Sequence, residues 1–88
     1  MEQVEFSKKQ LSALHRQISK NVAEMRKQKG VTQLDLALSI GYSSTSVIAK
    51  AEAGTENRHF SIEQLYKISE ALQIDIKVFF DGISKFNT

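Results

Sequence analysis

The chain contains no cysteine and no proline, and the absence of cysteine limits the kinds of site that it can form. Without cysteine there is no disulfide framework and no thiolate metal site, and two isolated histidines make no ligand cluster. We therefore expect neither a metal ion nor a cofactor. The missing cysteines leave the redox compartment open, although a reducing cytoplasm fits them.

Long apolar runs are also missing. No window approaches the roughly 20 apolar residues that a membrane-spanning helix needs. The opening stretch MEQVEFSKKQ has no basic region followed by a continuous apolar one, as a secretory signal would have. We expect a soluble cytoplasmic protein with no membrane partner.

Size and charge set further bounds. A chain of 88 residues supports one domain with a single modest core, near the size at which dimerisation helps to bury enough apolar surface. The net charge of +2 is too small to indicate nucleic acid by itself. Residues 1–30 do hold seven Lys or Arg against three acids, but from charge alone a solvated helix face is the preferred explanation of that excess.

Three segments share one helix-start pattern: an apolar residue, a hydroxyl N-cap, and a polar partner three positions later. They are FSKKQL (6–11), VTQLDL (31–36) and FSIEQL (60–65). The first and third also suit a capping box, because a glutamine stands at the third position. The pattern predicts helices that begin near residues 8, 33 and 62.

Glycines and apolar periodicity complete the expected elements. The first helix should run over about 8–29 and end at Gly30, and a second should cover 33–40 and end at Gly41. A third is expected over about 44–53, a fourth over 62–72, and a short fifth after Asp75. A strand competes only in the β-branched and aromatic run 74–80, so the predicted fold class is all-α.

The two short helices expected over 33–40 and 44–53 are joined by a tight turn that contains Gly41. This arrangement matches the helix-turn-helix unit. A generic antiparallel helical hairpin within a small bundle fits the spacing equally well.

Residues 18–80 add a more specific pattern, because their order and spacing resemble the Cro/repressor-type (XRE family) helix-turn-helix domain. The residues that carry the resemblance are Arg26, Gly30, Thr32, Gln33, Leu36, Ala37, Gly41, Glu52, Gly54, Leu72 and Ile74. It implies a compact five-helix bundle of the lambda-repressor-like type with an extended N-terminal helix. The expected domains are an N-terminal helical extension continuous with the first helix (1–17), the helix-turn-helix DNA-binding domain (18–81) and a C-terminal tail (82–88).

The resemblance also implies roles for particular residues. Gln33 matches a glutamine that contacts the DNA backbone, and an amide donor beside a helix N-terminus is well placed for a phosphate oxygen. Ala37 matches the small residue that lets two helices approach closely. Arg26 and Glu52 correspond to a structural ion pair that joins the first helix to the end of the third.

Four consecutive hydroxyl residues, Ser43, Ser44, Thr45 and Ser46, open the third helix in this frame. Ser43 or Ser44 is expected to cap it, while the other hydroxyls occupy the turn that enters the major groove. Such hydroxyls can contact phosphates or base edges, and Lys50 can reach a phosphate or a guanine. The alternative is that the hydroxyls only cap the helix and make its start soluble.

This sequence departs from the family pattern in two ways. The spacing from Gly41 to Glu52 is one residue longer than usual, so the hydroxyl residues are assigned as a group. The expected recognition helix also lacks arginine, glutamine and asparagine, the usual bidentate base readers. The following loop offers Asn57 and Arg58 as further DNA contacts, with His59 a weaker candidate, whereas His15 is expected to be solvent-exposed.

The leading hypothesis is a sequence-specific transcriptional regulator, a repressor or autoregulator that binds double-stranded DNA as a homodimer. Its two recognition helices would enter major grooves about 34 Å apart on a pseudo-palindromic site. The alternative is an antitoxin, with a toxin as protein partner, or another protein-interaction module of the same fold. The dimer interface is left open between the N-terminal extension and the C-terminal stretch VFFDGISKF (78–86). Catalysis is not expected, because no nucleophile–base arrangement or phosphate-binding glycine loop is present.

Overall fold

The computed structural model describes residues 5–84, apart from the side chain of Glu56, and this part of the chain is helical without a strand. Its elements are α1 (Lys8–Gln28), α2 (Gln33–Ser39), α3 (Ser46–Ala53), the 3-10 helix η1 (Thr55–Asn57), α4 (Ile62–Leu72) and the 3-10 helix η2 (Ile76–Phe80). The predicted all-α fold is therefore confirmed. The fifth helix of the expected bundle is a 3-10 helix.

Local capping sets the predicted helix starts. The Ser7 Oγ accepts a hydrogen bond from the Gln10 backbone N–H at 3.0 Å, and the Gln10 side chain accepts from the Ser7 backbone N–H. Ser61 and Gln64 form the same reciprocal box at the start of α4. These bonds satisfy backbone donors that an uncapped helix would leave without a partner. The expected starts at residues 8, 33 and 62 are confirmed.

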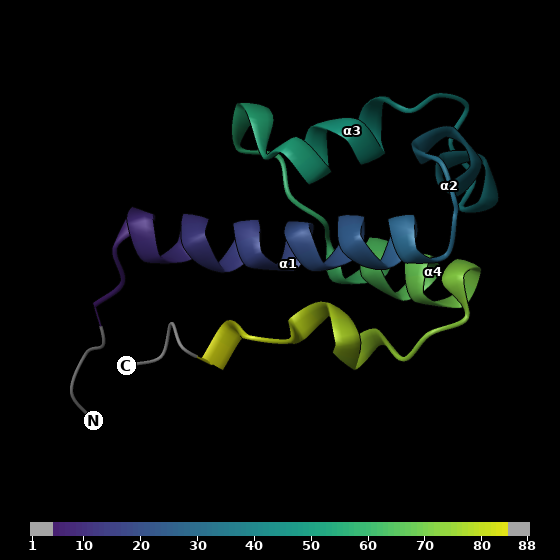
Figure 1. Cartoon of the computed structure of the whole chain (residues 1–88). Helices are drawn as coiled ribbons and strands as arrows, with labels where there is room; N and C mark the ends of the chain where they lie inside the picture. The colour runs from purple at the N-terminus through teal and green to yellow at the C-terminus, as the bar shows by residue number, and fades with distance from the viewer. Residues whose placement is uncertain (1–4, 85–88) are drawn as a thin grey trace.

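The long helix α1 is the central element, with α3 packed on one side and η2 on the other (Figure 1). The shorter helix α2 contacts both α3 and α4, and α4 also contacts η2. Six side chains from these elements are completely buried at the centre: Val22, Leu36, Ile48, Leu65, Ile68 and Phe79. This shared core holds α3 in place while its outer side remains at the surface.

The C-terminal segment packs against its own domain. Phe79 is completely buried, and Phe80 and Ile83 lie half-buried against the core. Within 78–84, the described part of the C-terminal candidate for a dimer interface, Phe79 is therefore not accessible to a partner, whereas Phe80 and Ile83 are partly exposed. The physical reason is that η2 lies against both α1 and α4, which cover its apolar side chains. Phe86 falls outside the described residues.

A buried asparagine ties this segment to α1. The Asn21 Nδ2 donates to the backbone carbonyls of Phe79 at 3.0 Å and Asp81 at 2.8 Å. Its Oδ1 accepts from the Gln17 Nε2 at 3.0 Å. A single side chain thus satisfies carbonyls at the end of η2 that the helix itself leaves without a donor.

We expect Asn21→Ala to lower the free energy of unfolding by about 1–3 kcal/mol, because one buried and one partly buried carbonyl acceptor would lose their donor. Urea unfolding followed by circular dichroism measures this change. Lys20→Ala, at the exposed neighbouring position of α1, is the matched control and should change stability by no more than about 0.5 kcal/mol. Equal stabilities of the two variants would contradict the anchoring role of Asn21.

The described helices also bear on the membrane question. None of them combines the length and the apolar character needed to cross a bilayer.

Candidate nucleic-acid interface

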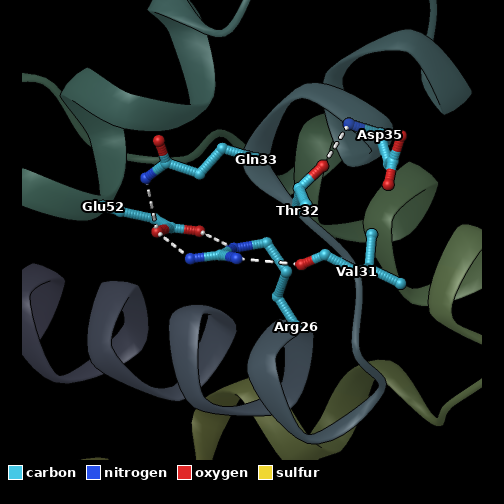
Figure 2. A network of polar contacts seen from close by, with 6 residues as sticks. All are labelled: Arg26, Val31, Thr32, Gln33, Asp35 and Glu52. Atoms are coloured by element: carbon cyan, nitrogen blue, oxygen red, sulfur yellow. Dashed lines mark hydrogen bonds and ion pairs between the residues drawn. The ribbon is translucent and has the colours of Figure 1, made fainter.

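A buried ion pair connects α1 to the C-terminal half of α3. The Arg26 Nε donates to the Glu52 Oε2 at 2.8 Å, and its Nη2 donates to the Glu52 Oε1 at 3.0 Å (Figure 2). The remaining Nη1 donates to the backbone carbonyl of Val31 at 2.9 Å. Both side chains are only 9% exposed. This bidentate fork fixes the orientation of α3 relative to α1, because both charges are held in one planar geometry.

Gln33 joins the same network. Its Nε2 donates to the Glu52 Oε1 at 3.0 Å, so the side chain is half-buried and turned toward α3 (Figure 2). The sequence had indicated an exposed amide at the start of α2. That start is capped by Thr32, whose Oγ1 accepts from the Asp35 N–H at 3.0 Å. Gln33 therefore stands beside a helix N-terminus, but one of its donors is already bound to Glu52.

The helix α3 begins two residues later than predicted. Its N-cap is Thr45, which makes no side-chain cap bond, and neither Ser43 nor Ser44 occupies that position. The Ser44 Oγ accepts only a long bond of 3.4 Å from the Ser46 N–H. The expectation that Ser43 or Ser44 caps the helix is therefore wrong. Because α3 is regular from Ser46 onward and Glu52 keeps its pair with Arg26, the additional residue lies in the turn before Ser46.

That turn is held to α4 through Tyr42. The Gln64 Nε2 donates to the Tyr42 hydroxyl at 2.9 Å, while the Gln64 Oε1 accepts from the Ser61 N–H at 2.9 Å. One glutamine thus caps α4 and positions the turn between α2 and α3. Ser43 and Ser44 are exposed in this turn, and Thr45 is half-buried.

The outer side of α3 faces a small hollow that it shares with the following loop. Ser46 and Lys50 of α3 line this hollow of about 130 Å³ together with Arg58 and His59. Ser46, Lys50 and Arg58 are all exposed. The structure therefore brings together a hydroxyl, an ammonium and a guanidinium group that the sequence had indicated separately.

The loop after α3 turns sharply at its start and again at its end. Gly54 has φ +70° and Asn57 has φ +58°, both in the left-handed region. Asn57 and Arg58 remain exposed. They line a second, larger cleft of about 540 Å³ that lies between this loop and the N-terminal turns of α1.

The two histidines meet across this larger cleft. The rings of His15 on α1 and His59 in the loop stack with centroids 3.8 Å apart and an interplanar angle of 19°. His15 is half-buried, so the expectation of a solvent-exposed residue is wrong. No local pattern could have shown this contact, because the two residues are far apart in the chain. Partial burial, and secondarily the charge of His59, lower the pKa of His15 from its ordinary value.

Gln33 lines neither cleft and lies apart from the group formed by Ser46, Lys50 and Arg58, although its partner Glu52 lines the larger cleft. Among the described residues, no group of three or more His, Asp or Glu is arranged to hold a metal ion. What gathers on this side of the domain is a set of hydrogen-bond donors and cations, a combination that suits a phosphate-rich polymer.

Comparison with known proteins agrees with this geometry. A family model described as helix-turn-helix matches residues 22–79, which is well over half of the chain. The match covers α2, the turn and α3, and begins within α1. No curated protein matches the chain.

Proposed function

The chain belongs to the Cro/repressor-type (XRE) helix-turn-helix family of DNA-binding transcription regulators, and from this premise we propose how it reads its site. In this proposal α3 enters the major groove of double-stranded DNA. A homodimer places two such helices on a pseudo-palindromic operator, and bound dimer represses or autoregulates the adjacent gene.

The single observation that carries the proposal is the convergence of Ser46, Lys50 and Arg58 on one exposed hollow. Lysine and arginine give affinity through phosphates and can also donate to guanine edges, while the serine hydroxyl can contact either. All three side chains come from α3 and the loop that follows it, so they form one surface that could follow a single groove of DNA.

The remaining proposed contacts flank this group. Ser43, Ser44 and Thr45 in the turn before α3 would contact the backbone at the groove edge, since hydroxyl donors there reach phosphate oxygens. Asn57 would do so on the loop side. At Gln33, the contact to the DNA backbone would be made by the backbone N–H groups at the start of α2, because the Gln33 side chain is engaged with Glu52.

For the homodimer, we propose a contact through the N-terminal extension, and the exposure of its apolar side chains supports this choice. Phe6 is 69% exposed and Leu11 is 46% exposed, whereas the described C-terminal apolar residues are covered by the domain itself. Exposed apolar side chains at one end of a long helix favour association with a second copy.

One observation favours the alternative of an antitoxin or other protein-interaction module. Four large apolar side chains are about half exposed or more on α2 and α4: Leu34, Leu38, Ile62 and Tyr66. A protein partner such as a toxin would gain apolar contact there. The two functions are compatible, because these helices are separate elements from α3.

The proposal is tested by titrating the protein against genomic fragments, including its own promoter, at two salt concentrations, followed by footprinting. A protected two-fold-symmetric site whose affinity falls as salt rises would support a dimeric regulator. Binding no stronger than to random DNA, even at low salt, would overturn it and direct attention to a protein partner.

On such a site we expect Lys50→Ala to weaken binding by about tenfold, since one good base or phosphate contact contributes about 1–3 kcal/mol. If the contact is to phosphate, the slope of log affinity against log salt should fall by about one. Lys67→Ala on α4 is the matched control, because this lysine is exposed and pairs with Glu63 one turn earlier on the same helix. An equal loss of DNA affinity in both variants would mean that the overall charge of the protein, rather than a contact made by α3, explains the effect.

A further inference from the structure

The larger cleft lies between the C-terminal end of α3 with the loop that follows it and a part of α1 that precedes the matched family region. Its cationic and titratable side chains are Lys8, His15 and Arg16 from α1, and Arg58 and His59 from the loop after α3. The cleft is open to the surface and has a volume of about 540 Å³. Three permanent cations and two imidazoles therefore face one hollow.

The cleft has one acidic side chain among its described lining residues, and this carboxylate is already engaged. Glu52 accepts hydrogen bonds from the Arg26 Nε and Nη2 and from the Gln33 Nε2. It therefore does little to neutralise Lys8 and Arg16. The cleft keeps an excess of positive charge, which attracts an anion rather than an apolar ligand.

The cleft is continuous with the surface of α3 through two shared residues. Arg58 and His59 line both the larger cleft and the small hollow that contains Ser46 and Lys50. An anionic polymer that follows α3 along Ser46 and Lys50 would reach Arg58 next and then the histidine pair. A free small anion would not need this continuity, whereas successive phosphates of one DNA strand would use it.

We propose that this cleft binds a backbone phosphate of the same DNA that α3 reads, and that the stacked pair of His15 and His59 makes this contact stronger as pH falls. The inference rests on the proposed DNA-binding function and adds a second contact region, supplied by the N-terminal extension of α1. His15 and His59 are the only histidines in the chain. Any histidine-linked pH dependence of DNA binding must therefore arise in this cleft.

The sign of the effect follows from the charges that surround the pair. In the free protein the pKa of His15 is lowered, first by partial burial and then by His59, so the uncharged form is favoured. The other charged groups that line the cleft are Lys8 and Arg16 on α1, Arg58 in the loop, and Glu52, which is held by Arg26. A phosphate in the cleft reverses this balance, because a nearby negative charge favours the protonated imidazole.

DNA binding is thus coupled to proton uptake. Since the complex holds more protons than the free protein, DNA affinity rises as pH falls and declines as pH rises through the neutral range. A rise of about one unit in the pKa of His15 on binding corresponds to about a tenfold gain in affinity at low pH. The protonated cleft also adds one cationic contact, so the salt slope should be steeper by about 0.9 at low pH.

The experiment measures affinity for the footprinted DNA site at pH 6 and pH 8, each at two salt concentrations. Three proteins are compared: the wild type, His59→Gln, and His15→Gln with His59→Gln. Glutamine keeps hydrogen-bonding capacity but cannot take up the proton. His59 is exposed, so the single variant should fold normally, and circular dichroism melting checks all three.

We expect wild-type affinity to be about tenfold higher at pH 6 than at pH 8, with less than about a twofold difference for the double variant. The single variant should keep a pH effect, because His15 can still take up a proton when phosphate enters the cleft. A pH-independent wild type, or a double variant that keeps the full pH effect, would overturn the cleft proposal while leaving DNA reading by α3 intact. Failure to bind any DNA preferentially at either pH would overturn both proposals.

Inorganic phosphate separates a DNA contact from a small-anion site. If millimolar phosphate shifted the imidazole NMR titration of His15 as strongly as DNA does, while DNA affinity stayed independent of pH, the cleft would be a small-anion site and the proposal would be wrong. A shift produced by DNA and much weaker with phosphate alone would support the continuous contact.

Discussion

Replacing Arg26 by methionine should lower the free energy of unfolding by about 3–5 kcal/mol, one of the two largest effects expected in this domain. The substitution leaves the carboxylate of Glu52 buried, with the Gln33 amide as its remaining partner among residues 5–84, and it leaves the Val31 carbonyl without the Arg26 donor. A buried charge without its counterion is costly because water no longer solvates it. Urea unfolding at neutral pH, followed by circular dichroism, measures the loss.

The double variant Arg26→Met with Glu52→Leu distinguishes the cost of leaving a buried charge without its partner from the cost of losing the packing of the Arg26 side chain. Removing both charges should restore most of the lost stability, since a well-packed apolar replacement of a buried ion pair is often close to neutral. If the single variant lost less than about 1 kcal/mol, the pair would contribute little to holding α3 on α1. If the double variant were as unstable as the single one, packing rather than charge would explain the loss.

Phe79→Ala should cost a similar amount, about 3–5 kcal/mol, for a different reason. Phe79 is completely buried, and η2 brings it between α1 and α4, so truncation removes apolar contact and leaves a cavity in the shared core. A domain of this size has only about 5–15 kcal/mol of stability in total, so a marked drop in the melting temperature should follow. Thermal and urea unfolding both report it.

Phe6→Ala is the matched control for this substitution. It removes the same side chain at a position that is 69% exposed, and it should change stability by no more than about 0.5 kcal/mol. Comparable losses in the two variants would contradict the placement of Phe79 in the core. If Phe6 contributes to a dimer, its effect should instead depend on protein concentration, which distinguishes association from folding.

Features encoded over a few neighbouring residues were predicted well. The caps at Ser7 and Ser61 depend on a partner three positions away, so the bonds that start α1 and α4 can be recognised in the sequence. Gly30 and Gly54 adopt positive φ where the expected helices end. The family pattern added the pairing of Arg26 with Glu52, which no local rule provides.

The start of α3 could not be located in the same way. Any of four successive hydroxyl residues can act as an N-cap, so the local preference is nearly equal along Ser43–Ser46. The structure selects Thr45 because Glu52 must meet Arg26 and Tyr42 must meet Gln64, and these two contacts set the length of chain left for the turn. Tertiary contacts therefore decided a boundary that the sequence left open.

The sequence by itself determined the helical class, most helix boundaries and the family, because caps, periodicity and motif spacing are properties of short stretches of chain. Only the tertiary structure decided the stacking of His15 on His59, the anchoring of η2 by Asn21, and the placement of Lys50 and Arg58 around one hollow. Each of these arrangements involves residues that lie on different elements. Their distance depends on how the helices pack around the common core, which no local pattern specifies.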